Sequence, residues 1–301
     1  MGTPDHAVPF LETLISSGNK PIAIVTQPDR GSGRSLAIEP TPVKTVGASY
    51  DIPILQPEHI NDTSSITQLF ALHPDLFVVV AYGQILKKVV LTLPVYGCIN
   101  VHFSLLPRHR GASPVEESIL SGDTETGVTL IKMDEQLDHG PILAAQSLPI
   151  DPQDTTPSLR KKLERIGASL LTDTIQKIFE NKLTATPQDE RSATHTRRLT
   201  RQSGRIDWKK SATEIDRQIR ALNPWPSTWT VCNEKRIKIL EAFARAGGVN
   251  PSDRIGSFRN GTILCGSGAI VPRLIQMEGK RPASMEEFSR GYRSLLTQKC
   301  E

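Results

Sequence analysis

The sequence predicts an α/β fold in its first part, with a doubly wound, mostly parallel sheet, followed by a small C-terminal β-barrel. Continuous apolar runs without polar alternation cover residues 21–27, 75–82 and 98–101. Helix-like stretches separate them, which is typical of a parallel sheet covered on both faces. Short strand-like pieces with glycine turns follow residue 228 and favour the barrel. A chain of 301 residues is long enough for two such domains.

The elements follow in order along the chain. Helical spacing of apolar residues predicts helices over 9–17, 64–72, 85–91, 155–182 and 212–221. Two further strands are predicted over 126–133 and 142–150, and the barrel strands over 228–232, 236–240, 255–258, 262–265 and 273–277. Residues 183–203 lose periodicity and are rich in Thr, Arg and Gln. We interpret them as a linker between a catalytic domain, 1–182, and a basic domain, 204–301.

Charge is distributed unevenly between the two halves. Residues 1–190 hold 15 Lys and Arg against 22 Asp and Glu, whereas residues 191–301 hold 21 against 10. The basic half suits a polyanion such as a nucleic acid, although a solvated surface without a ligand would have the same composition. No apolar stretch approaches the length of a membrane span, and the first residues do not form a secretory signal. The sequence therefore favours a protein outside the membrane.

Four cysteines, at positions 98, 232, 265 and 300, are scattered without a C-x-x-C pair. This spacing predicts free thiols in a reducing compartment, and neither disulfides nor zinc ligands.

The candidate chemistry lies between Gly97 and Gly140. Asn100 and His102 are two residues apart, so a strand would place both side chains on one face. Asp138 follows another extended run. An amide donor, an imidazole and a carboxylate can stabilise an oxyanion and move a proton. The alternatives are a satisfied polar pair, a metal site, which this set fits poorly, and a hydrolase with Ser104 as nucleophile, which lacks the G-x-S-x-G elbow.

Other polar residues of this region can be interpreted without a catalytic role. Arg108 and Arg110 could hold a carboxylate or phosphate, or could belong to an exposed turn. We interpret His109 and His139 as surface residues.

Ordered motifs extend along almost the whole chain: Gly2-Thr3-Pro4-Asp5, Thr26-Gln27-Pro28-Asp29-Arg30, Asn100-Val101-His102, Ser104-Leu105-Leu106-Pro107, Arg110-Gly111-Ala112, Leu137-Asp138, Arg205-Ile206-Asp207-Trp208 and Asn223-Pro224-Trp225-Pro226. Together they resemble the methionyl-tRNA formyltransferases. The Asn, His and Asp set alone also occurs in glycinamide-ribonucleotide formyltransferases, formyltetrahydrofolate hydrolases and sugar-nucleotide formyltransferases.

The resemblance implies a formyltransferase-type Rossmann-like fold and transfer of a formyl group from 10-formyltetrahydrofolate to the methionine of initiator tRNA. It implies a cytoplasmic monomer that needs no metal and no membrane. It places the catalytic triad at Asn100, His102 and Asp138. It places folate contacts at Ser104, Leu105, Leu106, Pro107, Tyr82 and Leu86, and tRNA contacts at Arg30, Arg34 and Lys44, with the barrel gripping the tRNA. The alternatives are a sugar-nucleotide formyltransferase and an inactive tRNA-binding relic.

The chain departs from the family pattern at three places. Family members carry an apolar strand immediately before Met-Gly-Thr-Pro-Asp. We therefore expect that Met1 is an internal methionine, that the native protein begins upstream, and that the first strand of the catalytic domain is missing. Residues 33–39 are less basic than in relatives, and Phe103 should narrow the space beside the site.

Overall fold

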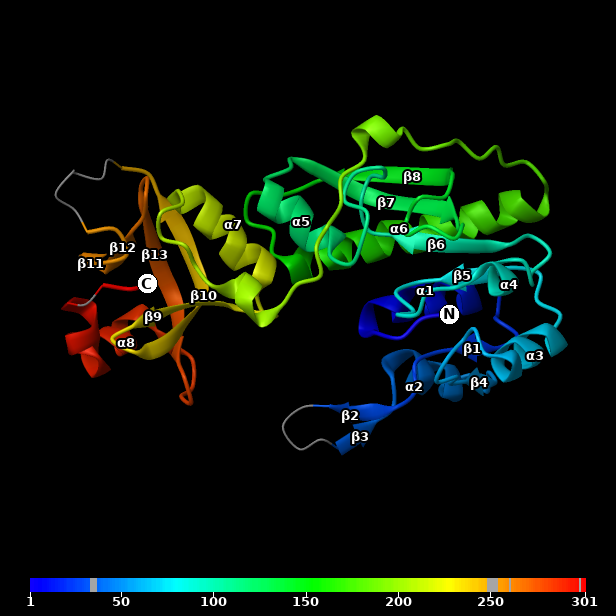
Figure 1. Cartoon of the computed structure of the whole chain (residues 1–301), viewed down its shortest axis with the longest axis horizontal. Coiled ribbons are helices and arrows are strands. Elements are labelled where there is room, and N and C mark those ends of the chain that lie inside the picture. Colours follow the sequence, from blue (N-terminus) through cyan, green and yellow to red (C-terminus); the bar gives the residue numbers. More distant parts are fainter. Residues whose placement is uncertain (33–36, 248–253, 260, 298) are drawn as a thin grey trace. The chain divides into compact units, whose positions relative to one another are not determined.

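The computed structural model describes residues 1–32, 37–247, 254–259, 261–297 and 299–301 (Figure 1). The chain forms two compact units. The first comprises Met1–Pro114, Glu125–Pro149 and Arg160–Thr196, and the second comprises Val115–Thr124, Ile150–Leu159 and Arg197–Glu301. Residues 183–196 of the predicted linker thus lie within the first unit.

The first unit contains helices, short 3₁₀ turns and strands in alternation. Its helices and turns are η1 (Asp5–Ala7), α1 (Val8–Ser16), α2 (Pro42–Ser49), α3 (Thr63–Ala71), α4 (Lys88–Leu91), most of α6 (Thr156–Phe179) and η2 (Glu190–Ser192). Its strands are β1 (Ile24–Val25), β2 (Arg30–Ser32), β3 (Ala37–Glu39), β4 (Ile54–Leu55), β5 (Phe77–Val79), β6 (Cys98–His102), β7 (Glu125–Lys132) and β8 (Ile142–Pro149). Local sequence explains the element ends. For example, α2 begins where the Thr41 hydroxyl accepts from the Lys44 N–H.

The strands of the first unit form three sheets. β1 and β4 pair in parallel, β2 and β3 form an antiparallel hairpin, and the third sheet has the order β5-β6-β7-β8. In that sheet β5 and β6 are parallel, whereas β7 and β8 are antiparallel to their neighbours. The α/β class with a parallel core is confirmed, but the sheet is more mixed than predicted. The connection between β7 and β8 is too short for a crossover, so these strands pair antiparallel.

Met1 and Gly2 lie between β1 and β5. The Gly2 N–H donates to Val25 O at 3.0 Å, the Val80 N–H donates to Met1 O at 2.9 Å, and the Met1 ammonium donates to Val78 O at 2.7 Å. A largely apolar cavity of about 300 Å³ lies beside them, lined by residues of β1, α1, β5 and the end of α6. Burial lowers the pKa of the Met1 ammonium to about 6. The expectation of a missing first strand stays a prediction.

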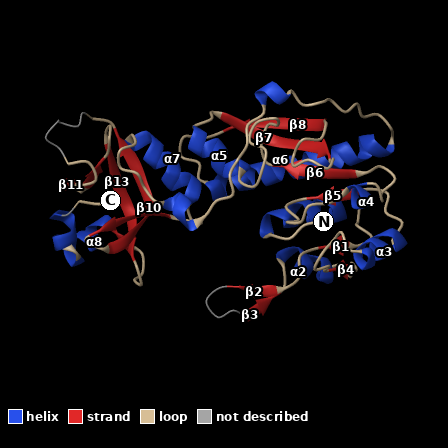
Figure 2. Cartoon of the chain, viewed as in Figure 1, coloured by secondary structure: helices blue, strands red, loops and turns tan. Residues whose placement is uncertain are grey.

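The second unit is rich in antiparallel strands (Figure 2). Its strands are β9 (Thr228–Cys232), β10 (Lys235–Arg245), β11 (Phe258–Arg259), β12 (Thr262–Leu264), β13 (Ala269–Met277) and β14 (Ala283–Ser284). Its helices and turns are most of α5 (Pro114–Ser121), η3 (Arg201–Gly204), α7 (Ala212–Leu222), α8 (Met285–Gly291) and η4 (Arg293–Thr297). α7 packs its apolar face, including Ile215 and Ile219, into the core formed by β9, β10 and β13.

The sheet of the second unit has the order β11-β12-β13-β10-β9, with β14 on β13. The C-terminal residues lie beside both ends of this order: Cys300 forms a single bridge with Cys232 of β9, and Lys299 forms one with Ser257, just before β11. The described strands therefore form a curled sheet whose edges are linked by single bridges, where the sequence predicted a barrel.

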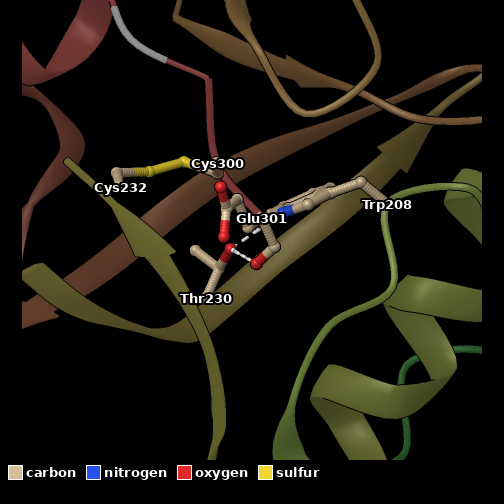
Figure 3. The surroundings of a disulfide bond; sticks show 5 residues. All are labelled: Trp208, Thr230, Cys232, Cys300 and Glu301. Carbon is tan, nitrogen blue, oxygen red and sulfur yellow. Dashed lines mark hydrogen bonds between the residues drawn. A yellow bond between two sulfur atoms is a disulfide. The ribbon is translucent and has the colours of Figure 1, made fainter. Parts of the chain in front are cut away.

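A disulfide joins Cys232 to Cys300, so the prediction of free thiols is wrong for these two residues (Figure 3). Cys98 and Cys265 are buried free thiols, as expected. The pairing was hidden because 68 positions separate the two cysteines and only the return of the C-terminus to β9 brings them together. Beside the bond, the Trp208 Nε1–H donates to the Thr230 hydroxyl at 2.9 Å, and that hydroxyl donates to Glu301 O at 2.8 Å.

We expect reduction of this disulfide to lower the free energy of unfolding of the second unit by about 2–4 kcal/mol, because a closed loop of this length restricts the unfolded chain. Thermal unfolding with and without a reductant measures the effect. The Cys232→Ser, Cys300→Ser double variant is the control and should not respond to the reductant. Equal melting of the parent chain in both conditions would contradict the prediction.

Candidate active site

Asn100 and His102 lie on the same face of β6, as their spacing predicts. β6 is held between β5 and β7, with Asn100 opposite Val79 on one side and Ile131 on the other. Asp138 enters from the turn between β7 and β8, where it adopts a left-handed backbone with φ +52°. Gly140 is required two residues later, because a Cβ there would lie 1.8 Å from Lys132 O. The turn therefore brings a carboxylate to the end of β6.

The carboxylate of Asp138 contacts two side chains of β6 and the backbone of Gly111. Its Oδ1 accepts from Asn100 Nδ2 at 3.3 Å and lies 3.5 Å from His102 Nδ1. Its Oδ2 accepts from the Gly111 N–H at 2.8 Å. Burial raises the pKa of Asp138, but His102, the Gly111 N–H and the Arg110 charge together outweigh it, and the pKa lies below its ordinary value. Asp138 is therefore ionised at neutral pH.

The two nitrogens of His102 have different partners. Nε2 lies 3.0 Å from the carbonyl oxygen of His109, and since a carbonyl only accepts, Nε2 carries a hydrogen and donates it. Nδ1 is left facing Asp138. A second proton on Nδ1 makes the ring an imidazolium beside a carboxylate, with both groups almost fully buried.

His109 is not a surface residue, contrary to the prediction. Its side chain is buried, its backbone has φ +60°, and its N–H donates to the Thr194 hydroxyl at 2.8 Å. This conformation turns its carbonyl toward His102, a role that the side-chain pattern does not reveal.

The segment Ser104–Pro107 forms the turn that follows β6. Ser104 and Leu106 are buried, whereas Leu105 and Pro107 are partly exposed. The Ser104 hydroxyl donates to Arg108 O at 2.7 Å. That bond engages the hydroxyl proton in the turn and argues against a hydrolase with Ser104 as nucleophile.

Tyr82 and Leu86 belong to the buried core cluster that contains β5. Among the described residues, the Tyr82 hydroxyl has no hydrogen-bond partner although it is buried. Burial raises the pKa of Tyr82 to about 12, so the group is a neutral donor.

The predicted tRNA contacts differ in their surroundings. Arg30 has a side chain 72% exposed and lies 3.9 Å from Glu58. Lys44 pairs with Asp29, whose other oxygen accepts from Gln56 at 2.7 Å. Arg34 lies outside the described residues.

Sequence reasoning missed the part that residues 186–196 play at this site. Arg110, one of the two arginines left open between anion binding and an exposed turn, is buried and pairs with both carboxylate oxygens of Glu190, at 2.7 and 3.0 Å. Gln188 contacts both Arg110 and the turn of Asp138. The segment has no periodicity that predicts these contacts. Its only sequence signal is that Gln188 and Glu190 carry polar side chains.

In the described part of the chain, no group of three His, Cys, Asp or Glu residues could hold a metal ion. No helix in these ranges has the length and apolar character to cross a membrane.

Models of two protein families match the chain in order: "Formyl transferase" over residues 1–175 and "Formyl transferase, C-terminal domain" over 198–293. The chain belongs to the formyl transferase family. It is 40% identical to a methionyl-tRNA formyltransferase of Citrifermentans bemidjiense over 97% of this chain and 92% of that protein. It is 42% identical to a methionyl-tRNA formyltransferase of Methylococcus capsulatus over 95% of this chain and 94% of that one.

Solved structures of sugar formyltransferases share the fold. The sugar 3N-formyltransferase WlaRD, determined in the presence of dTDP and 5-N-formyl-THF, has a TM-score of 0.67 at 22% identity, over 93% of this chain and 97% of that one. The N-formyltransferase from Helicobacter canadensis, in complex with folinic acid and dTDP-3-aminofucose, has a TM-score of 0.66 at 22% identity, over 92% and 97%.

Proposed function

We propose that the chain transfers a formyl group from 10-formyltetrahydrofolate to the amino group of methionine on initiator methionyl-tRNA. The observation that carries the proposal is that the side chains of Asn100 and His102 both lie against the carboxylate of Asp138. The chain is a formyl transferase, and its relatives at about 40% identity are methionyl-tRNA formyltransferases. Translation initiation by this reaction places the protein in the cytoplasm, where we propose that it acts as a monomer.

Asn100 and His102 stabilise the developing charge in the proposed reaction. When bound, 10-formyltetrahydrofolate supplies a formyl carbon whose oxygen gains negative charge as the amine attacks. One N–H of Asn100 Nδ2 donates to Asp138, and the second can donate to that oxygen. A donor of this kind contributes about 3 kcal/mol to catalysis. The His102 ring lies beside the same carboxylate and adds a positive charge there when it is protonated on both nitrogens.

Asp138 is the proposed acceptor of the proton that the attacking amine loses. The attacking amine must lose a proton, and Asp138, ionised at neutral pH, can accept it directly or through water. That proton would then reach N10 of the folate as the C–N10 bond breaks, so that tetrahydrofolate leaves. His102 Nδ1, 3.5 Å from Oδ1 of Asp138, holds the carboxylate in place during the transfer.

Binding of the two substrates uses other parts of the chain. The partly exposed Leu105 and Pro107 and the unpartnered Tyr82 hydroxyl support a folate contact beside β6. Ser104, Leu106 and Leu86 are buried and would support that contact from behind. For tRNA, we propose the segment that carries Arg30, Arg34 and Lys44, together with the basic second unit.

The decisive experiment follows a labelled formyl group from 10-formyltetrahydrofolate to three acceptors: charged initiator tRNA, charged elongator tRNA and an amino-sugar nucleotide. We expect label on the initiator tRNA. Label on the amino sugar alone would favour the sugar-nucleotide alternative, which shares this fold. Salt-sensitive tRNA binding without transfer at any pH would favour the inactive relic.

A further inference from the structure

The side-chain amide of Gln188 joins two loops of the candidate site. Its Nε2 donates to the backbone oxygens of Asp138, at 2.9 Å, and of Gly140, at 2.8 Å. Its Oε1 accepts from Arg110 Nε at 3.0 Å and Nη2 at 2.8 Å. The amide nitrogen of Gln188 therefore donates two hydrogen bonds to the turn that carries Asp138, and the amide oxygen accepts two from Arg110. We call this set of contacts the Gln188 bridge.

Arg110 is a rigid anchor for the bridge. Its guanidinium is also held by both oxygens of Glu190. Its backbone N–H donates to Thr194 O at 2.9 Å, and its carbonyl accepts from the Thr196 N–H at 2.7 Å. Gly111 follows at once with φ +117°, and a Cβ there would lie 2.6 Å from the Thr196 hydroxyl. The position of the Gly111 N–H, which binds Asp138, is thus set by the same segment.

Asp138 needs such support because of its backbone. A residue with a side chain in the left-handed region is less stable there by about 1–2 kcal/mol. The carbonyl of Asp138 is one of the two oxygens that the Gln188 bridge holds, so the bridge fixes the peptide next to the strained residue. A turn without it can relax, and its carboxylate then moves relative to Asn100, His102 and Gly111.

We propose that Gln188 is a positioning residue for Asp138: a side chain outside the reacting groups that holds the catalytic carboxylate through the backbone of its turn and through Arg110. Its kinetic consequence rests on the proposed formyl transfer. Its structural consequence, the placement of the Asp138 carboxylate against Gly111, does not.

The kinetic test uses Gln188→Leu, which keeps the volume and removes the hydrogen bonds, and Gln188→Glu, which keeps an acceptor for Arg110 but has no donor for the two carbonyls. We expect kcat for formyl transfer to fall about 10- to 100-fold in both, with KM for charged tRNA and for the folate changed less than about threefold. Gln176→Leu is the matched control, since the Gln176 side chain is exposed and donates only to Glu180, the residue just after its helix. Its kcat should equal that of the parent.

A second measurement needs no activity. Amide hydrogen exchange at Gly111, followed by NMR, reports the bond to Asp138 directly. We expect exchange at Gly111 to be at least about tenfold faster in Gln188→Leu, while the amides of β7 exchange as in the parent. A parent chain without formyl transfer would refute the proposed function, and the exchange result would still decide the structural role. Unchanged exchange at Gly111, or an unchanged kcat in an active parent, overturns the proposal.

Discussion

His102→Ala and Asp138→Asn should each lower kcat for formyl transfer about 10²- to 10⁴-fold. His102→Ala removes the ring that lies against Asp138 and next to the developing oxyanion. Asp138→Asn keeps the shape of the side chain but removes the negative charge that holds His102 and accepts the proton. General acid–base and electrostatic contributions of this kind are each typically worth 10²- to 10⁴-fold. Single-turnover transfer of a labelled formyl group measures the loss.

These substitutions should leave tRNA affinity within about threefold, because both side chains are buried and binding to a phosphate backbone comes mainly from exposed Lys and Arg. His73→Ala is a matched control that removes an exposed imidazole far from Asp138 in the sequence. A variant of His102 or Asp138 with a near-normal rate would remove that residue from the mechanism.

Adding an apolar strand before Met1 should raise the melting temperature of the chain by at least about 5 °C. Met1 and Gly2 already pair with both β1 and β5, and the cavity beside them is largely apolar. About five Val and Ile residues, extended, would pair with both strands and join two sheets into one. Each buried side chain contributes about 1.5–3 kcal/mol, which about offsets the conformational entropy of ordering the residue, and each backbone hydrogen bond to β1 or β5 adds about 0.5–1.5 kcal/mol. An extension of five Gly and Ser residues is the control.

The same extension should remove a pH effect. The pKa of the Met1 ammonium is about 6 in the folded chain, below its ordinary value, so unfolding takes up a proton between pH 6 and 8. Stability from this group is therefore lowest below pH 6 and rises with pH, by up to roughly 3 kcal/mol, until pH 8. Chemical denaturation across this range measures the slope. Equal slopes and equal melting in the chains with and without the apolar extension would contradict both expectations.

Much of the candidate site was predictable because it lies in regular structure. A spacing of two residues in a strand put Asn100 and His102 on one face, and Asp138 followed the next strand. The strands predicted over 126–133 and 142–150 are found at Glu125–Lys132 and Ile142–Pro149, and the long helix predicted over 155–182 is found at Thr156–Phe179. Periodicity is a direct consequence of burial on one face, so the sequence carries it.

What could not be predicted depends on irregular backbone and on distant segments. The carbonyl of His109 reaches His102 only because that residue adopts φ +60°, and a carbonyl leaves no mark on the side-chain pattern. Gln188 and Glu190 lie in a segment without periodicity, some fifty or more positions from their partners. The predictions of free thiols at Cys232 and Cys300 and of an exposed His109 were wrong for the same reason.

The Gln188 bridge bears on how the gene should be divided for separate expression. The first family model ends at residue 175, and α6 ends at Phe179, so either point looks like a natural place to stop. A fragment ending there would retain Asn100, His102 and Asp138. It would lose the residues that hold Arg110 in place, which are Gln188, Glu190, Thr194 and Thr196. A fragment meant to preserve the geometry of the reacting groups has to extend to Thr196, well into the segment that the sequence alone predicts to be a linker.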